Sequence, residues 1–477
     1  MSKEHTESAA PPEQVREYGV CETVPMQARH FKFIDMLSTW VGANVQPNTW
    51  ALGGMLAASG LGIAAAITLV ANPICYIFLG LMGFIGYKVS TSAMGLTRFS
   101  LGIRGCQAST WINTLAMAGW CIVQNYVAAI SISYMLNAAF GMPCYGMPGG
   151  TVSMLIGALF SWVLTCLMVW VGGGKTLKIA ERIGVVLMLF FSLWMTVKIF
   201  STYNFADIIK WKAPKEAAMP LGLGIDNIAA FSLSWIPCAA DYTRYCKTKR
   251  SATIAPILGA TIGIYWFALV GTVGAIASAV QTGVFDPNAA DPSSIAMKLG
   301  LGIPAFVVVV ASTVTTNVIS LYSGTYSALN SMPEGYSFKK MSVLIGIFVA
   351  VLTVISTFIG SFLDIFYLML DYLGLIFPAL VAVMLVDYYL VRRGHYQMDE
   401  INKIGGVYWY SHGVNWYAMI AWMLGIACYY VCKQLPALQG TIGATFPSIF
   451  FTGIIYYLIA KLAICRGYYK DLQPQRQ

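Results

Sequence analysis

The strongest constraint on the fold of this chain is its series of long apolar runs, which carry almost no charged side chains. Charged residues make up only 10% of the 477 residues, whereas soluble domains carry about 25%. Lipid must therefore cover most of the chain, because so few charges cannot form a water-facing surface. Backbone groups in lipid have to be paired internally, and the runs lack the alternation of barrel strands. We predict an all-α polytopic membrane protein.

The apolar runs provide about 12 transmembrane helices, each near the ~20 residues that a bilayer requires. The predicted spans are 33–59, 62–87, 111–139, 151–171, 183–201, 219–240, 253–280, 302–329, 342–360, 363–390, 415–433 and 444–464. The longest outward loop, 281–301, is expected to hold a short helix. We predict one transmembrane domain at 32–465, preceded by a disordered cytoplasmic tail at 1–31 and followed by a cytoplasmic tail at 466–477.

The basic residues fall mostly on one side of this topology. With both termini in the cytoplasm, all but six of the 29 Lys and Arg residues lie in cytoplasmic loops and tails, as the positive-inside rule predicts. The six on the opposite side are Lys198, Lys210, Lys212, Lys215, Lys298 and Lys433. This asymmetry predicts a multi-pass protein of the plasma membrane, and it explains the net charge of +9 without a nucleic-acid partner.

Two predicted spans are interrupted by proline among polar residues. In the first span Pro47 follows Asn44 and Gln46, and in the sixth span Pro237 follows Ser232–Ser234. Broken helices are tolerated within a membrane where they line a cavity. The two spans are five apart, the offset of the inverted repeats in which secondary transporters bind ion and substrate. A pair of ordinary proline kinks would produce the same pattern.

The third span carries a possible binding face for a flat ring. Trp120 and Gln124 are four residues apart, so they lie on one helix face. The indole offers a stacking surface, and the amide offers both a donor and an acceptor. This pair suits a planar heterocycle with amide-like edges, such as a nucleobase. Packing of Trp120 and an interhelical hydrogen bond from Gln124 would explain the same residues.

The eighth span carries a possible ion site. Ser312, Thr315 and Thr316 place three hydroxyls on one helix face. Neutral oxygen ligands suit a monovalent cation, provided that this span packs against the break in the first span. The alternative is that the hydroxyls bond back to their own helix.

Other chemistry finds little support. The four histidines lie in predicted tails or loops, and the 11 cysteines form no metal-binding spacing. Gly172–Thr176 lacks the first glycine of a phosphate-binding loop. We therefore predict a gradient-driven transporter without cofactor, ATP or enzymatic activity, in which Asp35 and Asp364 are the better candidates for proton coupling.

Several motifs together resemble the nucleobase:cation symporter family, which includes cytosine, purine, hydantoin and allantoin permeases. The resemblance covers about residues 25–465, and the motifs are Trp40–Trp50, Thr97–Gly105, Gly119–Trp120, Ser234–Pro237 with Ala240–Tyr245, Thr315–Asn317 and Val386–Arg393. It implies a five-plus-five inverted repeat, at about 33–201 and 219–390, with two extra C-terminal helices at about 415–464.

The resemblance also implies two binding sites. A ring would stack on Trp120 beside amides. An ion would contact the carbonyls of Gly42 and of Val45 or Gln46, the Ser312 carbonyl and the hydroxyls of Thr315 and Thr316. The complete set of candidate substrate-binding residues is Trp120, Gln124, Phe231, Ser232, Ser234, Trp235, Asn44 and Gln46.

Two departures from the family pattern leave the substrate open. Cytosine permeases place an amide three residues before the tryptophan, where this chain has Met117, and the amide here is Gln124, as in hydantoin-type members. Ser232 stands where the family often places an aromatic residue, so Phe231 or Trp235 is expected to substitute for it.

We predict a monomeric secondary active transporter that imports cytosine, a purine or a thiamine-precursor pyrimidine by alternating access, coupled to Na⁺ or H⁺. Alternatives are a hydantoin- or allantoin-type permease, or an amino-acid or amine symporter of the same repeat fold.

Overall fold

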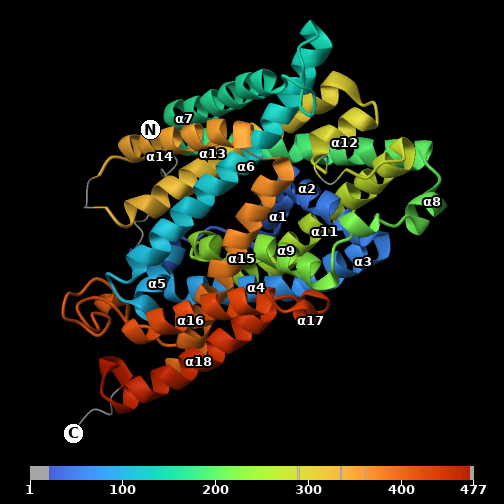
Figure 1. Cartoon of the computed structure of the whole chain (residues 1–477). Coiled ribbons are helices and arrows are strands. Elements are labelled where there is room, and N and C mark those ends of the chain that lie inside the picture. The colour runs from blue at the N-terminus through green and yellow to red at the C-terminus, as the bar shows by residue number, and fades with distance from the viewer. Residues whose placement is uncertain (1–20, 287, 289, 333–335, 360, 473–477) are drawn as a thin grey trace, which may run out of the picture.

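The computed structural model describes residues 21–286, 288, 290–332, 336–359 and 361–472, without the side chains of 172–181 and 359. Helices dominate this part of the chain, which contains no β-strand (Figure 1). The α-helices are α1 Phe33–Asn44, α2 Pro47–Leu56, α3 Leu61–Ala66, α4 Asn72–Val89, α5 Ala93–Leu101, α6 Cys106–Phe140, α7 Thr151–Thr202, α8 Phe205–Lys210, α9 Leu221–Leu233, α10 Ala239–Thr243, α11 Lys249–Thr282, α12 Pro292–Lys298, α13 Gly302–Leu329, α14 Phe338–Ile359, α15 Phe362–Val386, α16 Trp416–Lys433, α17 Pro436–Gln439 and α18 Thr445–Cys465. Two π-helical turns, Ile67–Ala71 and Asp387–Val391, adjoin α4 and α15.

Ten stretches of the described chain are long and apolar enough to cross a membrane. They coincide with ten of the twelve predicted spans, and they confirm the all-α polytopic class. The first predicted span is missing from the ten because it is divided into α1 and α2, which are each short. The eleventh, α16, is missing because its 18 residues include four Tyr or Trp at its two ends and the charged Lys433.

The described helices pack around a central pair of interrupted ones. Figure 1 shows α16 and α18 along one edge, α7 and α14 along the opposite edge, and α1 with α9 between them. In α7 the helical conformation runs on from the predicted span 151–171 to the predicted span 183–201. The predicted short helix of the outward loop is α12, whose N-terminus is capped by Asp291.

The first interruption lies between α1 and α2. Val45 and Gln46 leave the helical conformation, and Gln46 is fully extended (φ −147°, ψ 159°). Pro47 then occupies the first turn of α2, where its missing N–H costs no intrahelical bond. A proline three residues beyond Asn44 thus ends one helix and begins another, as the sequence predicted.

The second interruption follows α9. This helix ends at Leu233, a single 3₁₀ turn spans Ile236–Cys238, and the five-residue α10 follows. Pro237 lies within the 3₁₀ turn, because proline cannot donate the backbone bond that a continuous α-helix would need. Both predicted breaks are therefore confirmed.

The α2 and α11 helices pack backbone against backbone. A methyl group added to Gly53 would collide with the Ala268 carbonyl oxygen, and one added to Gly271 would collide with that of Trp50. The Thr272 hydroxyl donates to the Gly53 carbonyl (2.8 Å). Only glycine permits this close approach, so the seam between α2 and α11 is tight over several turns.

Residues 21–31, which the sequence placed in the tail, pack against the end of α4. The Arg29 guanidinium donates to the Tyr87 carbonyl (3.1 Å) and to the Ser90 hydroxyl (2.9 Å). We call this the N-terminal side of the molecule, and the opposite side, where α12 lies, the α12 side. Residues 1–20 and 473–477 lie outside the described part of the chain.

Candidate functional site

A cavity lies where the two interruptions meet α6, α7 and α13. It encloses about 880 Å³ of empty space, including its open mouth. Nine of the thirteen predicted site residues line it: Gly42, Val45, Gln46, Trp120, Gln124, Ser234, Trp235, Thr315 and Thr316. The eighth span and the first break thus face the same cavity.

The cavity extends from the breaks toward the N-terminal side. Along α13 its lining continues from Thr316 to Ser323, and along α1 it reaches back to Thr39. The lining residues that were not predicted are Thr39, Trp40, Ala43, Met117, Gly184, Val185, Cys238, Tyr242, Ile319, Ser320 and Ser323. Trp40 and Tyr242 stand inside motifs that carried the family resemblance, whereas nothing in the sequence singles out Gly184.

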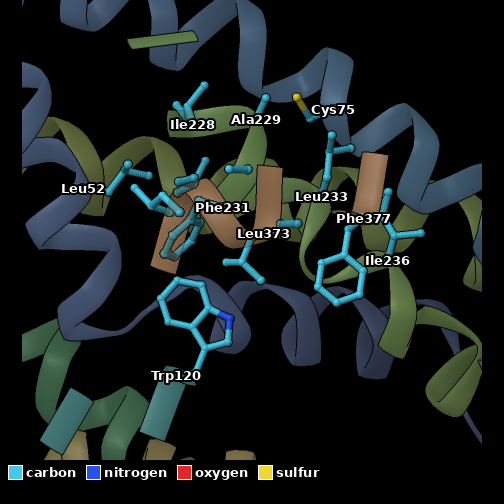
Figure 2. Packing of buried hydrophobic residues seen from close by; sticks show 14 of the residues in the cluster. Leu52, Cys75, Trp120, Ile228, Ala229, Phe231, Leu233, Ile236, Leu373 and Phe377 are labelled. Carbon is cyan, nitrogen blue, oxygen red and sulfur yellow. The ribbon is translucent and has the colours of Figure 1, made fainter. Parts of the chain in front are cut away.

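The indole of Trp120 is held by aromatic side chains of two other helices. Phe231 of α9 meets it edge-on, with ring centroids 5.3 Å apart, and Phe366 of α15 meets it at 6.3 Å. Figure 2 shows the indole pointing from α6 toward Phe231 and Leu373. Phe231 is fully buried and lies outside the cavity lining, so its position in the structure is behind Trp120.

Two amide oxygens in the cavity lack a hydrogen-bond partner. The side-chain oxygens of Gln46 and Gln124 are both buried and accept no bond from another side chain or from the backbone. A buried acceptor left unpaired costs about 1–3 kcal/mol. A ligand that presents N–H donors to both oxygens would remove that cost.

The hydroxyls of Thr315 and Thr316 both donate to the Ser312 carbonyl, at 2.8 and 2.9 Å. The sequence allowed two interpretations of these hydroxyls, an ion site or hydrogen bonds to their own helix. The observed bonds fit the second interpretation and are compatible with the first. Because each hydroxyl proton points at its own helix, the oxygen lone pairs of these cavity-lining residues remain available to a cation. The Ser312 hydroxyl is buried outside the lining and has no partner.

The first break contributes Gly42 and Val45 to the lining of the same cavity. The Gly42 carbonyl accepts a bond from the Val45 amide (3.1 Å), and no bond to the Val45 carbonyl is seen among the described residues. On α7, a methyl group at Gly184 would collide with the Thr315 hydroxyl. The glycine therefore lets α7 approach α13 closely at the candidate ion site.

Two predicted substrate residues face away from the cavity. Asn44 donates to the Trp40 carbonyl (3.2 Å) and accepts from the Tyr76 hydroxyl (2.9 Å). Ser232 donates to the Asn72 side-chain oxygen (2.9 Å). Both side chains point toward α4, where their partners Tyr76 and Asn72 lie. They therefore face a different direction from the cavity-lining residues next to them in the chain.

Comparison with known proteins identifies the relatives of this chain. Residues 23–457 match the family described as "Permease for cytosine/purines, uracil, thiamine, allantoin". The chain belongs to this family. The allantoin permease of Bacillus subtilis is 22% identical over 93% of this permease and 92% of its own length. The cytosine permease of Escherichia coli K12 is 24% identical over 75% of this permease and 76% of its own length.

Solved structures share the fold of this permease. Mhp1, a nucleobase-cation-symport-1 family transporter solved in a closed conformation with bromovinylhydantoin bound, superposes with a TM-score of 0.74 at 16% identity. The match covers 95% of this permease and 97% of Mhp1. An inward-facing structure of Mhp1 gives the same TM-score. The predicted family and the predicted transporter class are thus confirmed, and the protein is a multi-pass membrane transporter.

Proposed function

We propose that this permease imports a planar heterocycle with amide-like edges, by alternating access and coupled to a monovalent cation. One observation carries the proposal: Trp120, Gln46 and Gln124 line a single cavity at the helix breaks, and the side-chain oxygens of the two glutamines lack a hydrogen-bond partner. Nucleobases, hydantoins and allantoin all combine a flat ring with N–H donors. Cytosine, purines and thiamine-precursor pyrimidines are the leading substrates, and hydantoin and allantoin are the alternatives.

The coupling ion is proposed to be Na⁺, held by Thr315 and Thr316 opposite the carbonyls of Gly42 and Val45. No carboxylate lines the described cavity. The two acidic candidates for proton coupling serve as helix caps: Asp35 accepts from the Lys32 amide (2.8 Å), and Asp364 accepts from the Ser361 hydroxyl (2.7 Å). These roles favour Na⁺ over H⁺.

The proposed setting is the plasma membrane, with the permease acting as a monomer and both termini in the cytoplasm. The uneven distribution of basic residues supports this orientation. In that orientation the cavity, which extends toward the N-terminal side, leads to the cytoplasm. We propose that the repeats 33–201 and 219–390 move relative to each other and so expose the cavity alternately to the two sides of the membrane.

The experiment is uptake of radiolabelled nucleobases, thiamine-precursor pyrimidines, hydantoin and allantoin into proteoliposomes, with and without an inward Na⁺ gradient. We expect saturable, Na⁺-stimulated uptake of at least one heterocycle. Trp120→Ala is expected to abolish it, whereas Trp266→Ala, on the lipid-facing side of α11 with 39% of the side chain exposed, should leave it unchanged. Uptake of amino acids alone would instead support a symporter of amino acids or amines.

A further inference from the structure

One turn of α4 contacts both interrupted helices. The Tyr76 hydroxyl donates to the Asn44 side-chain oxygen at 2.9 Å. The Ser232 hydroxyl donates to the side-chain oxygen of Asn72, one turn before Tyr76 on α4 (2.9 Å). All four side chains are fully buried. We call these two hydrogen-bonded pairs the α4 bridge.

The α4 bridge joins the ends of the two helices that stop at the cavity. Asn44 is the last residue of α1, and Ser232 is the residue before the last one of α9. The residues that follow these ends, Val45 and Ser234, line the cavity. The bridge therefore lies directly behind the lining of both breaks, on the side that substrate does not reach.

Hydrogen bonds in such a site are strong and directional. The bridge lies in an apolar surrounding of low dielectric constant, where a paired polar group is stabilised and an unpaired one is costly. Neither break retains a continuous helical backbone to fix the spacing between its halves. Hydrogen bonds from one turn of α4 to the ends of α1 and α9 supply a fixed spacing that the backbone lacks.

We propose that Tyr76 is a positioning residue for transport, which holds the first and second breaks at the separation that substrate and ion require. The inference rests on the proposed function, because it concerns the same cavity. Removing the hydroxyl leaves the Asn44 side-chain oxygen without its donor, so that the end of α1 can move relative to the end of α9, which Asn72 still holds.

The test is Tyr76→Phe, measured in proteoliposomes by uptake and in detergent by thermal shift. We expect the KM for the transported heterocycle and the half-saturating Na⁺ concentration each to rise about tenfold, the equivalent of one typical buried hydrogen bond, while the maximal rate stays within about twofold. The matched control is Tyr389→Phe, which removes a hydroxyl bonded to the Leu81 carbonyl of the same helix α4 (2.9 Å). It should change neither quantity.

Several results would overturn the inference. A Tyr76→Phe protein with lowered thermal stability but wild-type KM and Na⁺ dependence would show a merely structural hydroxyl. If Tyr76→Phe does not fold, Ser232→Ala takes its place, and an unchanged KM in that variant overturns the inference equally. If the wild-type permease takes up no heterocycle, the proposed function fails, and the inference is then decided by whether Tyr76→Phe weakens the Na⁺-induced thermal shift.

Discussion

The two interrupted helices resemble each other in sequence, with a proline after polar residues, yet the structure leaves them chemically different. At the first break the side chains of Gln46, Asn48 and Thr49 are buried, and each has polar atoms without a partner in the protein. At the second break the Ser234 hydroxyl donates to the Phe231 carbonyl (2.6 Å). The first break therefore contains polar atoms without hydrogen-bond partners, whereas the Ser234 hydroxyl of the second break has a partner within the protein.

This difference suggests that the two breaks have different functions. Each unpaired buried polar group destabilises the folded protein by about 1–3 kcal/mol, and such groups are found where a bound ligand supplies the missing hydrogen bond. Of Gln46, Asn48 and Thr49, Gln46 is the one that lines the cavity, so we expect it to contact a ligand. The second break places Trp235 in the cavity lining and supplies the turn that ends α9. We expect the second break to shape the cavity more than to bind.

The largest effect should come from replacing the first-break amide. We expect Gln46→Leu to raise the KM for substrate roughly 5- to 150-fold, because it removes a hydrogen bond worth about 1–3 kcal/mol in a site with little water. Ser234→Ala, at the second break, should raise it at most about threefold. Concentration-dependent uptake measures both. Equal effects from the two variants would erase the distinction between the breaks.

The next effect concerns the ion opposite the first break. Thr316→Val should raise the half-saturating Na⁺ concentration about tenfold, since it removes one of the oxygen ligands proposed for the ion. The matched control is Thr313→Val, because the Thr313 hydroxyl bonds to the Val309 carbonyl (2.6 Å) away from the cavity. An unaltered Na⁺ dependence in Thr316→Val would place the ion elsewhere, and uptake that never depends on Na⁺ would indicate a proton as the coupling ion.

A smaller effect is expected from the helix that supports Thr315. Gly184→Ala should displace the Thr315 hydroxyl, since the new methyl group would collide with it, and raise the half-saturating Na⁺ concentration about threefold. Gly62→Ala, whose methyl group would meet no atom within 4 Å, serves as the control. A wild-type Na⁺ response of Gly184→Ala would argue that Thr315 is not a ligand.

The smallest effect is one of stability, and its direction distinguishes the breaks. Ser234→Ala removes a satisfied hydrogen bond and should lower the free energy of unfolding by about 1 kcal/mol. Asn48→Ala removes an amide that has no partner, so the loss should be smaller in the absence of ligand. Thermal-shift measurements without substrate compare the two. A greater loss from Asn48→Ala would mean that its amide is paired in the unliganded protein.

The sequence predicted the breaks and most of the cavity lining because those signals are local. A proline and several amides inside an apolar run, or a Trp120/Gln124 pair at helical spacing, can be read without knowing any neighbour. The directions of Asn44 and Ser232 could not be read this way. A break resets the rotation of each half-helix, and packing against α4 then decides which side chains face the cavity. Gly184 was missed because its importance lies in how closely α7 and α13 approach.

The glycine seam between α2 and α11 has a consequence for protein engineering. The relatives share only about a fifth of their residues with this permease, so chimaeras are an obvious way to exchange substrate preference. A chimaera that takes α1 and α2 from a relative would need glycine at position 53, because any side chain there would collide with the Ala268 carbonyl of α11. A relative with a larger residue at that position would have to contribute α11 as well, so that the exchanged segment would be discontinuous in sequence.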